Sequence, residues 1–250
     1  MSDLDPPLST AAMLAIGDEI LSGRTKDKNI GHLADILTAA GIDLKEVRIV
    51  SDEPERIAAA LNDLRTGYTY VFTSGGIGPT HDDVTADAVG LAFGLPVDEH
   101  PEAVQRLSEH YAARDLPFTP ARRRMTRTPE GATLIDNPVS VAPGFRIGNV
   151  FVMAGVPAVF RAMVDAVLPT LPAGRLMLSR AIPCAHGEGV IGDPLAAIQK
   201  RYPGVAIGSY PKFGEGKPST ELVLRSRDEV ALDAAADEVR AMVAALDQAG

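Results

Sequence analysis

Short apolar runs alternate with stretches of helical periodicity along the first two thirds of the chain. The apolar runs, which are typical of buried strands, cover residues 13–16, 47–50 and 68–73. After each run, apolar residues recur three and four positions apart, which predicts a helix before the next strand. Repeated β-α units with apolar strands favour a mainly parallel sheet covered by helices on both faces. Ligands of such sheets bind at the carboxyl ends of the strands.

Antiparallel pairing is expected further along the chain. Residues 145–147 and 150–153 are separated by the dipeptide Gly148-Asn149, which is the pattern of a β-hairpin with a two-residue turn. We therefore expect an antiparallel edge of the sheet there. Helices are predicted on either side, at residues 102–114 and 160–168.

The chain changes character after residue 174. The segment 169–174 is rich in Pro and Gly and is the strongest linker candidate. Beyond it the predicted strands and helices form a small α+β lobe, in which Cys184 is expected to be a core residue. We therefore predict two domains, residues 1–170 and residues 175–250. The lobe's predicted elements are a strand through Ile182, a helix at 194–200, strands at 205–209 and 221–225, and a helix at 228–246.

Composition and charge limit the possible partners. The 250 residues are 46% hydrophobic and 23% charged, with a formal net charge of −9 and a pI near 5.0. This excess of acid opposes a diffuse attraction to nucleic acid or anionic membranes, so an anionic ligand has to be bound locally. No signal peptide or membrane span is expected from the sequence. Cys184 is the single cysteine, which excludes an internal disulfide or thiolate metal cluster and makes a cytoplasmic location the expectation.

Residues 71–85 carry most of the candidate chemistry. A strand-like run ends in three glycines, Gly75, Gly76 and Gly78. Glycines at a strand-to-helix turn let backbone N–H groups approach an anion, and the N-terminus of the following helix adds partial positive charge. Asp82 and Asp83 follow, and two carboxylates beside a phosphate repel it unless a cation lies between them. The segment therefore predicts a seat for a phosphorylated ligand together with a divalent metal.

A structural explanation of the same acids stays open. Thr80 and Asp83 stand three positions apart and could form a capping box at a helix start, which explains the acids but not the glycines. The segment also differs from two common nucleotide motifs. Pro79-Thr80 follows Gly78 where a P-loop needs Lys and a hydroxyl residue, and His81 stands where a dinucleotide fingerprint needs glycine. His81 is either an acid near neutral pH or a solvated loop residue.

Two further acids follow predicted strands. Asp18 lies in the segment 17–23 after the first strand, which would open beside the glycine loop in a parallel sheet. It could bind a metal or a ribose hydroxyl, and an ordinary turn acid explains it equally well. Asp52 ends the second strand, and for this residue alone a helix cap before Pro54 is the simpler explanation.

Together these segments resemble the molybdopterin-binding-like (MoCF biosynthesis) domain of the competence-and-damage-inducible CinA family. The resemblance covers roughly residues 11–170. The lobe at 175–250 resembles the small KH-like lobe that follows in that family, and residues 207–211 are similar to the amino-terminal domain of eukaryotic FAD synthases. The family's carboxy-terminal amidase domain is expected to be absent, which makes a standalone form the expectation. The matching segments are residues 17–23, Asp52, residues 74–85, Ala142-Pro143-Gly144 and Gly155-Val156-Pro157.

The resemblance implies a three-layer α/β/α domain, shared with molybdenum-cofactor biosynthesis proteins, beside the small lobe. It also implies a metal-dependent pyrophosphatase that acts on ADP-ribose, FAD or a related dinucleotide. Asp18, Asp82 and Asp83 are then expected to be catalytic and to hold the metal, with Mg²⁺ the expected ion. The substrate-binding residues that it implies are Gly75, Gly76, Gly78, Thr80, Asp52, Pro143, Gly144, Gly155 and Pro157.

Two segments depart from the family pattern. The usual Gly-Thr-Ala-Pro-Gly is Ser140-Val141-Ala142-Pro143-Gly144 here, and the usual Leu-Pro-Gly-Val-Pro is Met153-Ala154-Gly155-Val156-Pro157. The β-branched Val141 and the lost proline alter the shape of the wall opposite the glycine loop. The substrate of this protein is therefore expected to differ from that of the family more readily than its fold.

Two other groups of residues have competing interpretations. The arginines within residues 122–127 are either ligand contacts or a solvated helix face. Residues 189–192 have the Gly-x-x-Gly pattern of the loop by which KH domains clamp RNA. The acidic neighbours Glu188 and Asp193 oppose this use, so strong nucleic-acid binding is not expected.

The sequence thus favours a metal-dependent hydrolase of a nucleotide diphosphate linkage. The alternative is a protein that binds molybdopterin or its adenylated form, or transfers an adenylyl group, without net hydrolysis. An RNA-binding adaptor acting through the second lobe is the third class. The expected partner is a small nucleotide or pterin ligand without a membrane, and a homo-oligomer is expected.

Overall fold

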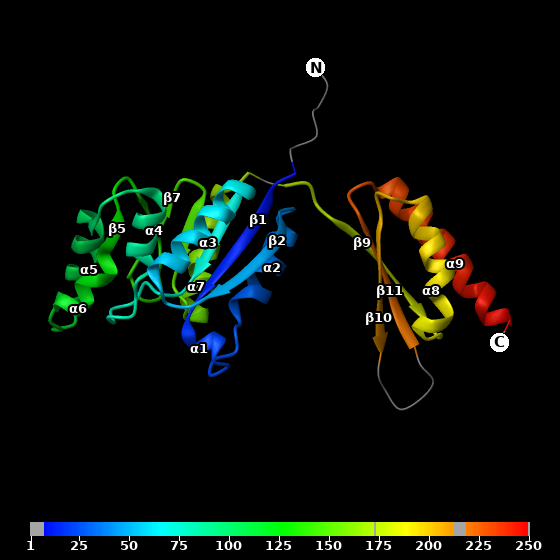
Figure 1. The fold of residues 1–250 in the computed structure, drawn as a ribbon, viewed down its shortest axis with the longest axis horizontal. Coiled ribbons are helices and arrows are strands. Elements are labelled where there is room, and N and C mark those ends of the chain that lie inside the picture. Colours follow the sequence, from blue (N-terminus) through cyan, green and yellow to red (C-terminus); the bar gives the residue numbers. More distant parts are fainter. Residues whose placement is uncertain (1–7, 173, 213–218, 250) are drawn as a thin grey trace, which may run out of the picture. The chain divides into compact units, whose positions relative to one another are not determined.

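The described residues divide into two compact units. The computed structural model describes residues 8–172, 174–212 and 219–249, and contacts group the chain as Met1–Gly174 and Arg175–Gly250. The first unit contains a six-stranded sheet of order β2-β1-β3-β8-β7-β6, and the second a three-stranded sheet of order β10-β11-β9 (Figure 1).

The large sheet is parallel over four neighbouring strands and antiparallel over the other two. Its central strands are β1 (Thr10–Ile16), β2 (Asp43–Val50), β3 (Tyr70–Ser74) and β8 (Val150–Met153), which pair in parallel. The predicted hairpin is confirmed, since β7 (Gly144–Ile147) pairs antiparallel with β8. It is not the edge, however, because β6 (Thr133–Ile135) pairs outside it. Strand β6 was not predicted from the sequence, because a strand of three residues is too short to show a periodic pattern of apolar positions.

Helices cover both faces of this sheet, as the alternating pattern predicts. Along β1, Met13 belongs to one buried cluster and Leu14 to the other, because successive side chains of a strand point to opposite faces. Helices α2 (Asn29–Ala39) and α7 (Pro157–Val167) supply the Met13 side. Helices α3 (Pro54–Gly67) and α4 (Thr85–Phe93) supply the Leu14 side. This is the expected three-layer α/β/α arrangement.

A cap of small helices and two short strands, together with the longer helix α5, follows α4. It comprises β4 (Val97–Glu99), α5 (Pro101–Ala112), α6 (Pro120–Arg123), the 3₁₀ helix η1 (Arg124–Thr126) and β5 (Arg127–Pro129), with β4 antiparallel to β5. Its arginines bind protein groups. Arg127 donates two hydrogen bonds, of 2.8 and 2.6 Å, to the Asp87 carboxylate on α4, and Arg123 pairs with Glu99. The cap is thereby fastened to α4.

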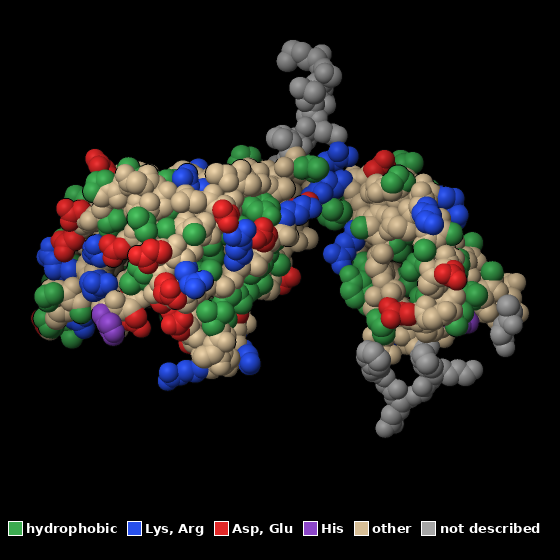
Figure 2. Space-filling model, in the orientation of Figure 1, with side chains coloured by type: hydrophobic (Ala, Val, Ile, Leu, Met, Phe, Trp, Pro, Cys, Tyr) green, Lys and Arg blue, Asp and Glu red, His purple; other side chains and the backbone are tan. Residues whose placement is uncertain are grey.

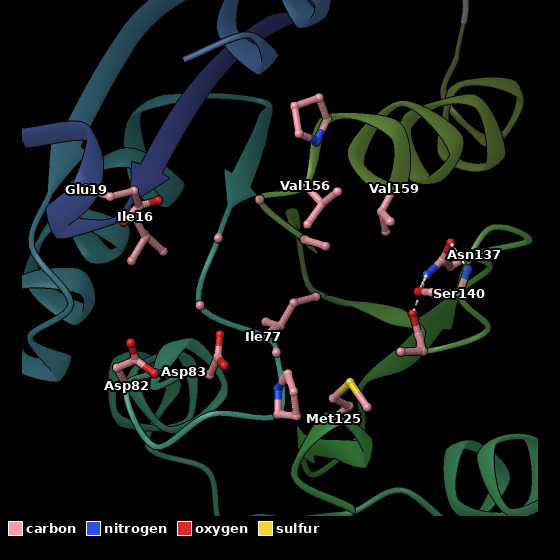
Figure 3. A pocket seen from close by; sticks show the side chains of 18 of the residues that line it. Ile16, Glu19, Ile77, Asp82, Asp83, Met125, Asn137, Ser140, Val156 and Val159 are labelled. Atoms are coloured by element: carbon pink, nitrogen blue, oxygen red, sulfur yellow. Dashed lines mark hydrogen bonds between the residues drawn. The ribbon is translucent and has the colours of Figure 1, made fainter. Parts of the chain in front are cut away.

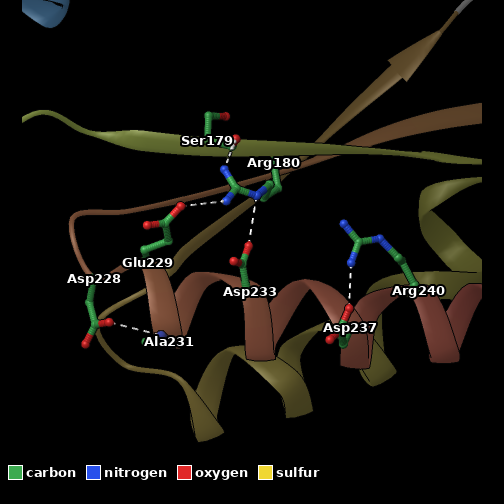
Figure 4. A network of polar contacts seen from close by, with 8 residues as sticks. All are labelled: Ser179, Arg180, Asp228, Glu229, Ala231, Asp233, Asp237 and Arg240. Atoms are coloured by element: carbon green, nitrogen blue, oxygen red, sulfur yellow. Dashed lines mark hydrogen bonds and ion pairs between the residues drawn. The ribbon is translucent and has the colours of Figure 1, made fainter.

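The second unit has its own core. Its elements are β9 (Leu178–Cys184), α8 (Glu188–Arg201), β10 (Ala206–Lys212), β11 (Ser219–Ser226) and α9 (Glu229–Ala249). Leu222 and Leu224 of β11 are fully buried against Leu232 of α9. Arg180 of β9 also reaches α9, through ion pairs of 2.9 Å with Asp233 and 3.3 Å with Glu229 (Figure 4). Cys184 is buried in this core, as predicted.

The Gly-x-x-Gly segment of this unit is not a loop. Residues 189–192 lie in the first turns of α8, and Ile191 between the two glycines is buried in the core. The resemblance to an RNA-clamping loop was therefore wrong, because local spacing did not show that an apolar core position lies within the motif.

The visible surface mixes charges of both signs. Acidic and basic side chains are interspersed over the first unit on the face drawn in Figure 2. Within the described residues, we find no helix with the length and apolar character needed to cross a membrane.

Candidate functional site

A cavity of about 560 Å³ opens where β1, β3 and β8 end (Figure 3). These strands are neighbours and parallel, so the loops that follow them meet at one edge of the sheet. The glycine loop after β3 forms the floor between the other two loops. The lining residues are Ile16, Glu19, Thr25, Gly75, Gly76, Ile77, Gly78, Pro79, Asp82, Asp83, Met125, Asn137, Ser140, Ala142, Ala154, Gly155, Val156, Pro157 and Val159.

The first two glycines of the loop are required by close packing. Gly75 has φ +114°, and a Cβ there would lie 2.2 Å from the backbone oxygen of Ile16. Gly76 has φ +69°, and a Cβ there would lie 2.1 Å from Oγ1 of Thr85. Both conformations and both contacts exclude a side chain. The loop is consequently pressed against the end of β1 and the start of α4.

The loop has backbone N–H donors without a partner, in residues that line the cavity. Among the described residues, no acceptor pairs with the N–H groups of Gly76, Ile77 or Gly78. The preceding N–H, that of Gly75, is used by the oxygen of Met153 at 3.0 Å. Unpaired N–H groups in a glycine loop form a concave seat for an anion. The binding of a phosphate by this loop stays a prediction from the sequence.

Asp82 and Asp83 lie in a turn that precedes helix α4, and not in its first turn. Helix α4 begins at Thr85, whose N–H and hydroxyl bind the oxygens of Gly76 and Gly75 at 3.0 Å each. These bonds set the start of the helix after the acids. Residues 80–83 form a separate turn, closed by the Asp83 N–H on the Thr80 oxygen at 3.2 Å.

The turn is held from two sides. Oδ2 of Asp83 accepts hydrogen bonds from the Thr80 N–H at 2.8 Å and from the Thr80 hydroxyl at 2.6 Å. Arg124 of η1 donates to the oxygens of Thr80 and Asp83, each at 3.1 Å. The pairing of Thr80 with Asp83 that a capping box would use is therefore present, and Asp83 also lines the cavity. His81 is exposed on this turn.

The acids of the first loop differ from the prediction in their placement. Glu19, in the short helix α1 (Asp18–Leu21), lines the cavity, whereas Asp18 and Asp52 are not among the lining residues. The Asp18 N–H donates to the Asp52 carboxylate at 2.9 Å. Burial raises the pKa of Asp52 above its ordinary value, and the neighbouring carboxylates of Asp18, Glu19 and Asp82 raise it further.

The carboxylates do not by themselves form a metal centre. Within the described part of the chain, no three His, Cys, Asp or Glu side chains are grouped so that they could hold a metal ion. The expected set of Asp18, Asp82 and Asp83 is therefore not assembled as a three-carboxylate site. Asp82 and Asp83 do lie side by side at the glycine loop (Figure 3).

The opposite wall comes from the loops around β7 and after β8. Gly155 and Pro157, predicted as substrate-binding, line the cavity, whereas Thr80, Pro143 and Gly144 do not. Pro143 and Gly144 are buried, and a Cβ on Gly144 would lie 2.4 Å from the backbone oxygen of Val152. Gly144 thus allows β7 and β8 to pack closely behind the cavity.

Sequence reasoning missed the residues that organise these loops. Asn29, which is 3% exposed at the start of α2, donates to Ser74 at 2.7 Å and to the Gly155 oxygen at 2.8 Å. It thereby joins the end of β3 to the loop after β8. Asp27 binds the N–H groups of Asn29 and Ile30. The available signal was an Asp three residues before Ile30, where the helical apolar pattern begins. Glu19, Asn137 and Ser140 gave no such signal.

Both parts of the chain match known families. The family model described as "Probable molybdopterin binding domain" (MoCF_biosynth) matches residues 12–173. The chain belongs to this family. The model for the middle domain of FAD synthase matches residues 176–247 of this chain, where the sequence had suggested the amino-terminal domain of those enzymes.

Relatives confirm the resemblance to CinA. A CinA-like protein from Desulfosudis oleivorans is 33% identical over 82% of this chain, which spans 52% of that protein. A protein from Aeropyrum pernix is 31% identical over 93% of this chain and 90% of its own length. The crystal structure of CinA "with unknown function" from Thermoplasma acidophilum shares 30% identity and a TM-score of 0.60, covering 65% of this chain and 98% of that one. The chain is thus a CinA-like member of the molybdopterin binding domain family.

Proposed function

We propose that the cavity binds a nucleotide diphosphate and that the protein hydrolyses its diphosphate linkage with the help of a divalent metal. One observation carries this proposal. Gly76, Ile77 and Gly78, whose N–H groups have no acceptor among the described residues, line the same cavity as Glu19, Asp82 and Asp83. The N–H donors attract an anionic ligand, whereas the carboxylates repel it. The two groups can therefore bind the same ligand only when a cation is bound with it.

The residues present suit a magnesium ion bound with its ligand. Mg²⁺ keeps several waters and is usually held by one or two carboxylates together with substrate phosphates. Asp82 and Asp83 would supply these carboxylates, and Oδ1 of Asp83 is left over from the turn, because Thr80 uses Oδ2. The raised pKa of Asp52 also reflects carboxylate repulsion that a cation would relieve. A bound metal neutralises phosphate charge and lowers the pKa of its water.

The chain's own groups would divide the work between the two phosphates. The glycine loop would hold the phosphate that is not attacked, because fixed N–H groups stabilise developing negative charge without reorganising. The turn at residues 80–83 would fix the carboxylates relative to that seat, since Arg124 holds both ends of the turn. Glu19, which lines the cavity on the same side of Ile77 as Asp82 and Asp83 (Figure 3), would orient water.

A binding protein for molybdopterin is the second candidate. It is favoured by the family match and by the apolar part of the cavity wall, which includes Met125, Val156 and Val159. Such a wall suits a flat ring system. Stoichiometric binding of molybdopterin or its adenylated form, without release of a hydrolysis product, would favour this function over hydrolysis.

Turnover of a substrate panel by three variants tests the proposal. The panel is ADP-ribose, FAD, CoA and adenylated molybdopterin, each with and without Mg²⁺. Asp83→Asn keeps an oxygen that can accept from Thr80 but removes the charge, so we expect the fold to persist and hydrolysis to be lost. Asp83→Ala removes both. The control is Asp35→Asn on α2, whose exposed carboxylate lies outside the cavity.

The result separates a catalytic charge from a turn-closing side chain. If Asp83 only closes the turn, Asp83→Asn keeps wild-type turnover and Asp83→Ala lowers stability by about 1 kcal/mol. That outcome would remove Asp83 from the catalytic residues. Absence of metal-dependent turnover of every panel member by the wild type would refute the hydrolase function.

A further inference from the structure

We infer that Ser140 selects the ring-bearing part of the ligand by donating a hydrogen bond to an acceptor atom on the ring edge. The inference rests on the proposed function and names the ligand class that it needs: a diphosphate attached to a planar heteroaromatic ring. The cavity has two ends that differ in their side chains. Figure 3 shows Glu19, Asp82 and Asp83 on one side of Ile77, and Asn137, Ser140 and Val159 on the other.

The two ends suit different parts of one ligand. The end with the carboxylates and the glycine loop suits the diphosphate and its cation. The end near Ser140 is lined by Met125, Ala142 and Val159, which offer apolar surface to a ring. Pockets of this kind bind ligands through apolar walls and fix their orientation with a few placed polar groups. Ser140 is such a group.

The neighbouring Asn137 settles the direction of the Ser140 hydrogen bond. Asn137 is 5% exposed, and its Oδ1 accepts from the N–H groups of Val139 at 3.0 Å and Ser140 at 3.3 Å. Its Nδ2 donates to the backbone oxygen of Ala142 at 2.8 Å. Since N–H groups only donate and a carbonyl only accepts, these bonds fix which amide atom is nitrogen.

Asn137 is consequently the donor in its third contact as well. Its Nδ2 lies 2.6 Å from Oγ of Ser140, so the hydroxyl oxygen accepts and its own proton is left to give. Within the described residues no group accepts that proton. Ser140 is exposed at the cavity wall, where an acceptor atom on a ligand would complete the bond.

The loop holds this donor in place before any ligand arrives. Val141 has φ +66°, a left-handed conformation that is rare for a β-branched residue and costs about 1–2 kcal/mol. Such strain persists only where surrounding contacts determine the conformation. Here the Val141 N–H binds the oxygen of Asn137 at 3.0 Å, and the Asn137 side chain binds the residues on either side. Ser140 is therefore preorganised, which favours its use in recognition.

Calorimetric titration of Ser140→Ala and Ser140→Thr tests the inference. The probes are ADP, 6-hydroxymethylpterin diphosphate and inorganic pyrophosphate, each with Mg²⁺. We expect Ser140→Ala to bind the ring-bearing probe about fivefold more weakly, because one hydrogen bond is lost, and to bind pyrophosphate unchanged. Ser140→Thr keeps a hydroxyl and should restore the affinity. If the affinity falls only for ADP or only for the pterin diphosphate, that probe carries the ring that Ser140 binds. If the affinity falls for both, the site accepts either ring.

Several outcomes would overturn the inference. Unchanged affinity of Ser140→Ala for both ring-bearing probes would do so, and so would an equal loss for all three probes or a failure of Ser140→Thr to restore binding. If the wild type binds pyrophosphate as tightly as it binds ADP and the pterin diphosphate, only this inference is refuted and the proposed function stands. If it binds none of the probes, the proposed function falls with it. Equal thermal midpoints of the variants exclude misfolding as the cause.

Discussion

At the scale of single residues, space decides where glycine is needed. A Cβ at Gly75 would meet the backbone oxygen of Ile16 at 2.2 Å, whereas a Cβ at Gly94, the C-cap of α4, meets nothing within 4 Å. Both residues have positive φ. Gly75→Ala should therefore lower the free energy of unfolding by about 3 kcal/mol, since overpacking adds to backbone strain, and Gly94→Ala by about 1 kcal/mol. Urea denaturation measures both, and equal losses would contradict the packing argument.

The strained Val141 gives a prediction of opposite sign. Asn tolerates the left-handed conformation that Val141 adopts at φ +66°. Val141→Asn should therefore raise the thermal midpoint by roughly 2–4 °C, which corresponds to about 1 kcal/mol in a protein of this size. The measurement is scanning calorimetry. A lower midpoint would show that the Val141 side chain contributes packing that outweighs its strain.

Asp52 makes stability depend on pH. Its pKa is raised in the folded protein, mainly by burial and then by neighbouring carboxylates. The folded state thus binds this proton more tightly than the unfolded chain, so stability from this group is complete below its unfolded pKa, about 3.9, and declines as pH rises through the higher folded value. Asp52→Asn should melt above the wild type at pH 7, with the difference closing toward pH 3.5.

The control for Asp52 is an acid that is stabilised by a partner. Asp87→Asn loses its negative charge and one of its two hydrogen bonds from Arg127 and should melt below the wild type at pH 7. Thermal midpoints between pH 3.5 and 7, measured without divalent metal, test both variants. A melting temperature of Asp52→Asn that stays below the wild type throughout would show that the hydrogen bond from Asp18 outweighs the burial of charge.

At the scale of elements, the cap after α4 positions the acids of the cavity. Arg124 of η1 binds the two backbone oxygens that bracket the turn at residues 80–83. We expect Arg124→Met to lower kcat about tenfold, because displaced catalytic groups lose their orientation, with little change in KM for the substrate. Arg122→Met is the matched control, since Arg122 stacks on Tyr111 and donates to the Pro117 oxygen. Equal effects of the two variants would argue against a positioning role for Arg124.

Elements with a clear apolar period could be predicted, and those fixed by distant contacts could not. The strands and helices around Leu14 and Phe72 follow from periodicity because both faces of the sheet are buried. β6 pairs over three residues only, so its position depends on β7. The start of α4 could not be predicted from the sequence, because Thr85 is anchored by the oxygens of Gly75 and Gly76, contacts that exist only once the glycine loop has folded.

The residues of the candidate site also divide into those that could be predicted from the local sequence and those that could not. The glycines and the pair Asp82 and Asp83 were found because their types and order are informative locally. Glu19 could not be preferred over Asp18 by sequence, since neighbouring residues in α1 point in different directions. Asn137 was missed because its role is to join residues of one loop to each other, and a lone Asn before a Pro is common in turns.

At the scale of the whole molecule, the cavity and the second core belong to different units. Every lining residue lies in Met1–Gly174, whereas Leu224 is fully buried in the core of Arg175–Gly250. Leu224→Ala should therefore lower the stability of the second unit by about 2–5 kcal/mol while pyrophosphate affinity stays at the wild-type value. Calorimetry of unfolding and of binding on the same sample checks both. A parallel loss of affinity would show that the second unit supports the cavity.

Gly75 touches two other chain segments at once, and this restricts how the protein can diverge. It leaves no room for a side chain beside Ile16, and a Cβ on Gly155 would lie 3.3 Å from the Gly75 Cα. The loops after β1, β3 and β8 therefore cannot drift independently. A larger residue in one of them becomes acceptable only after another has moved away, so neutral substitutions here should arise in a set order. Libraries that vary the three loops together should yield active variants that single-site libraries never reach.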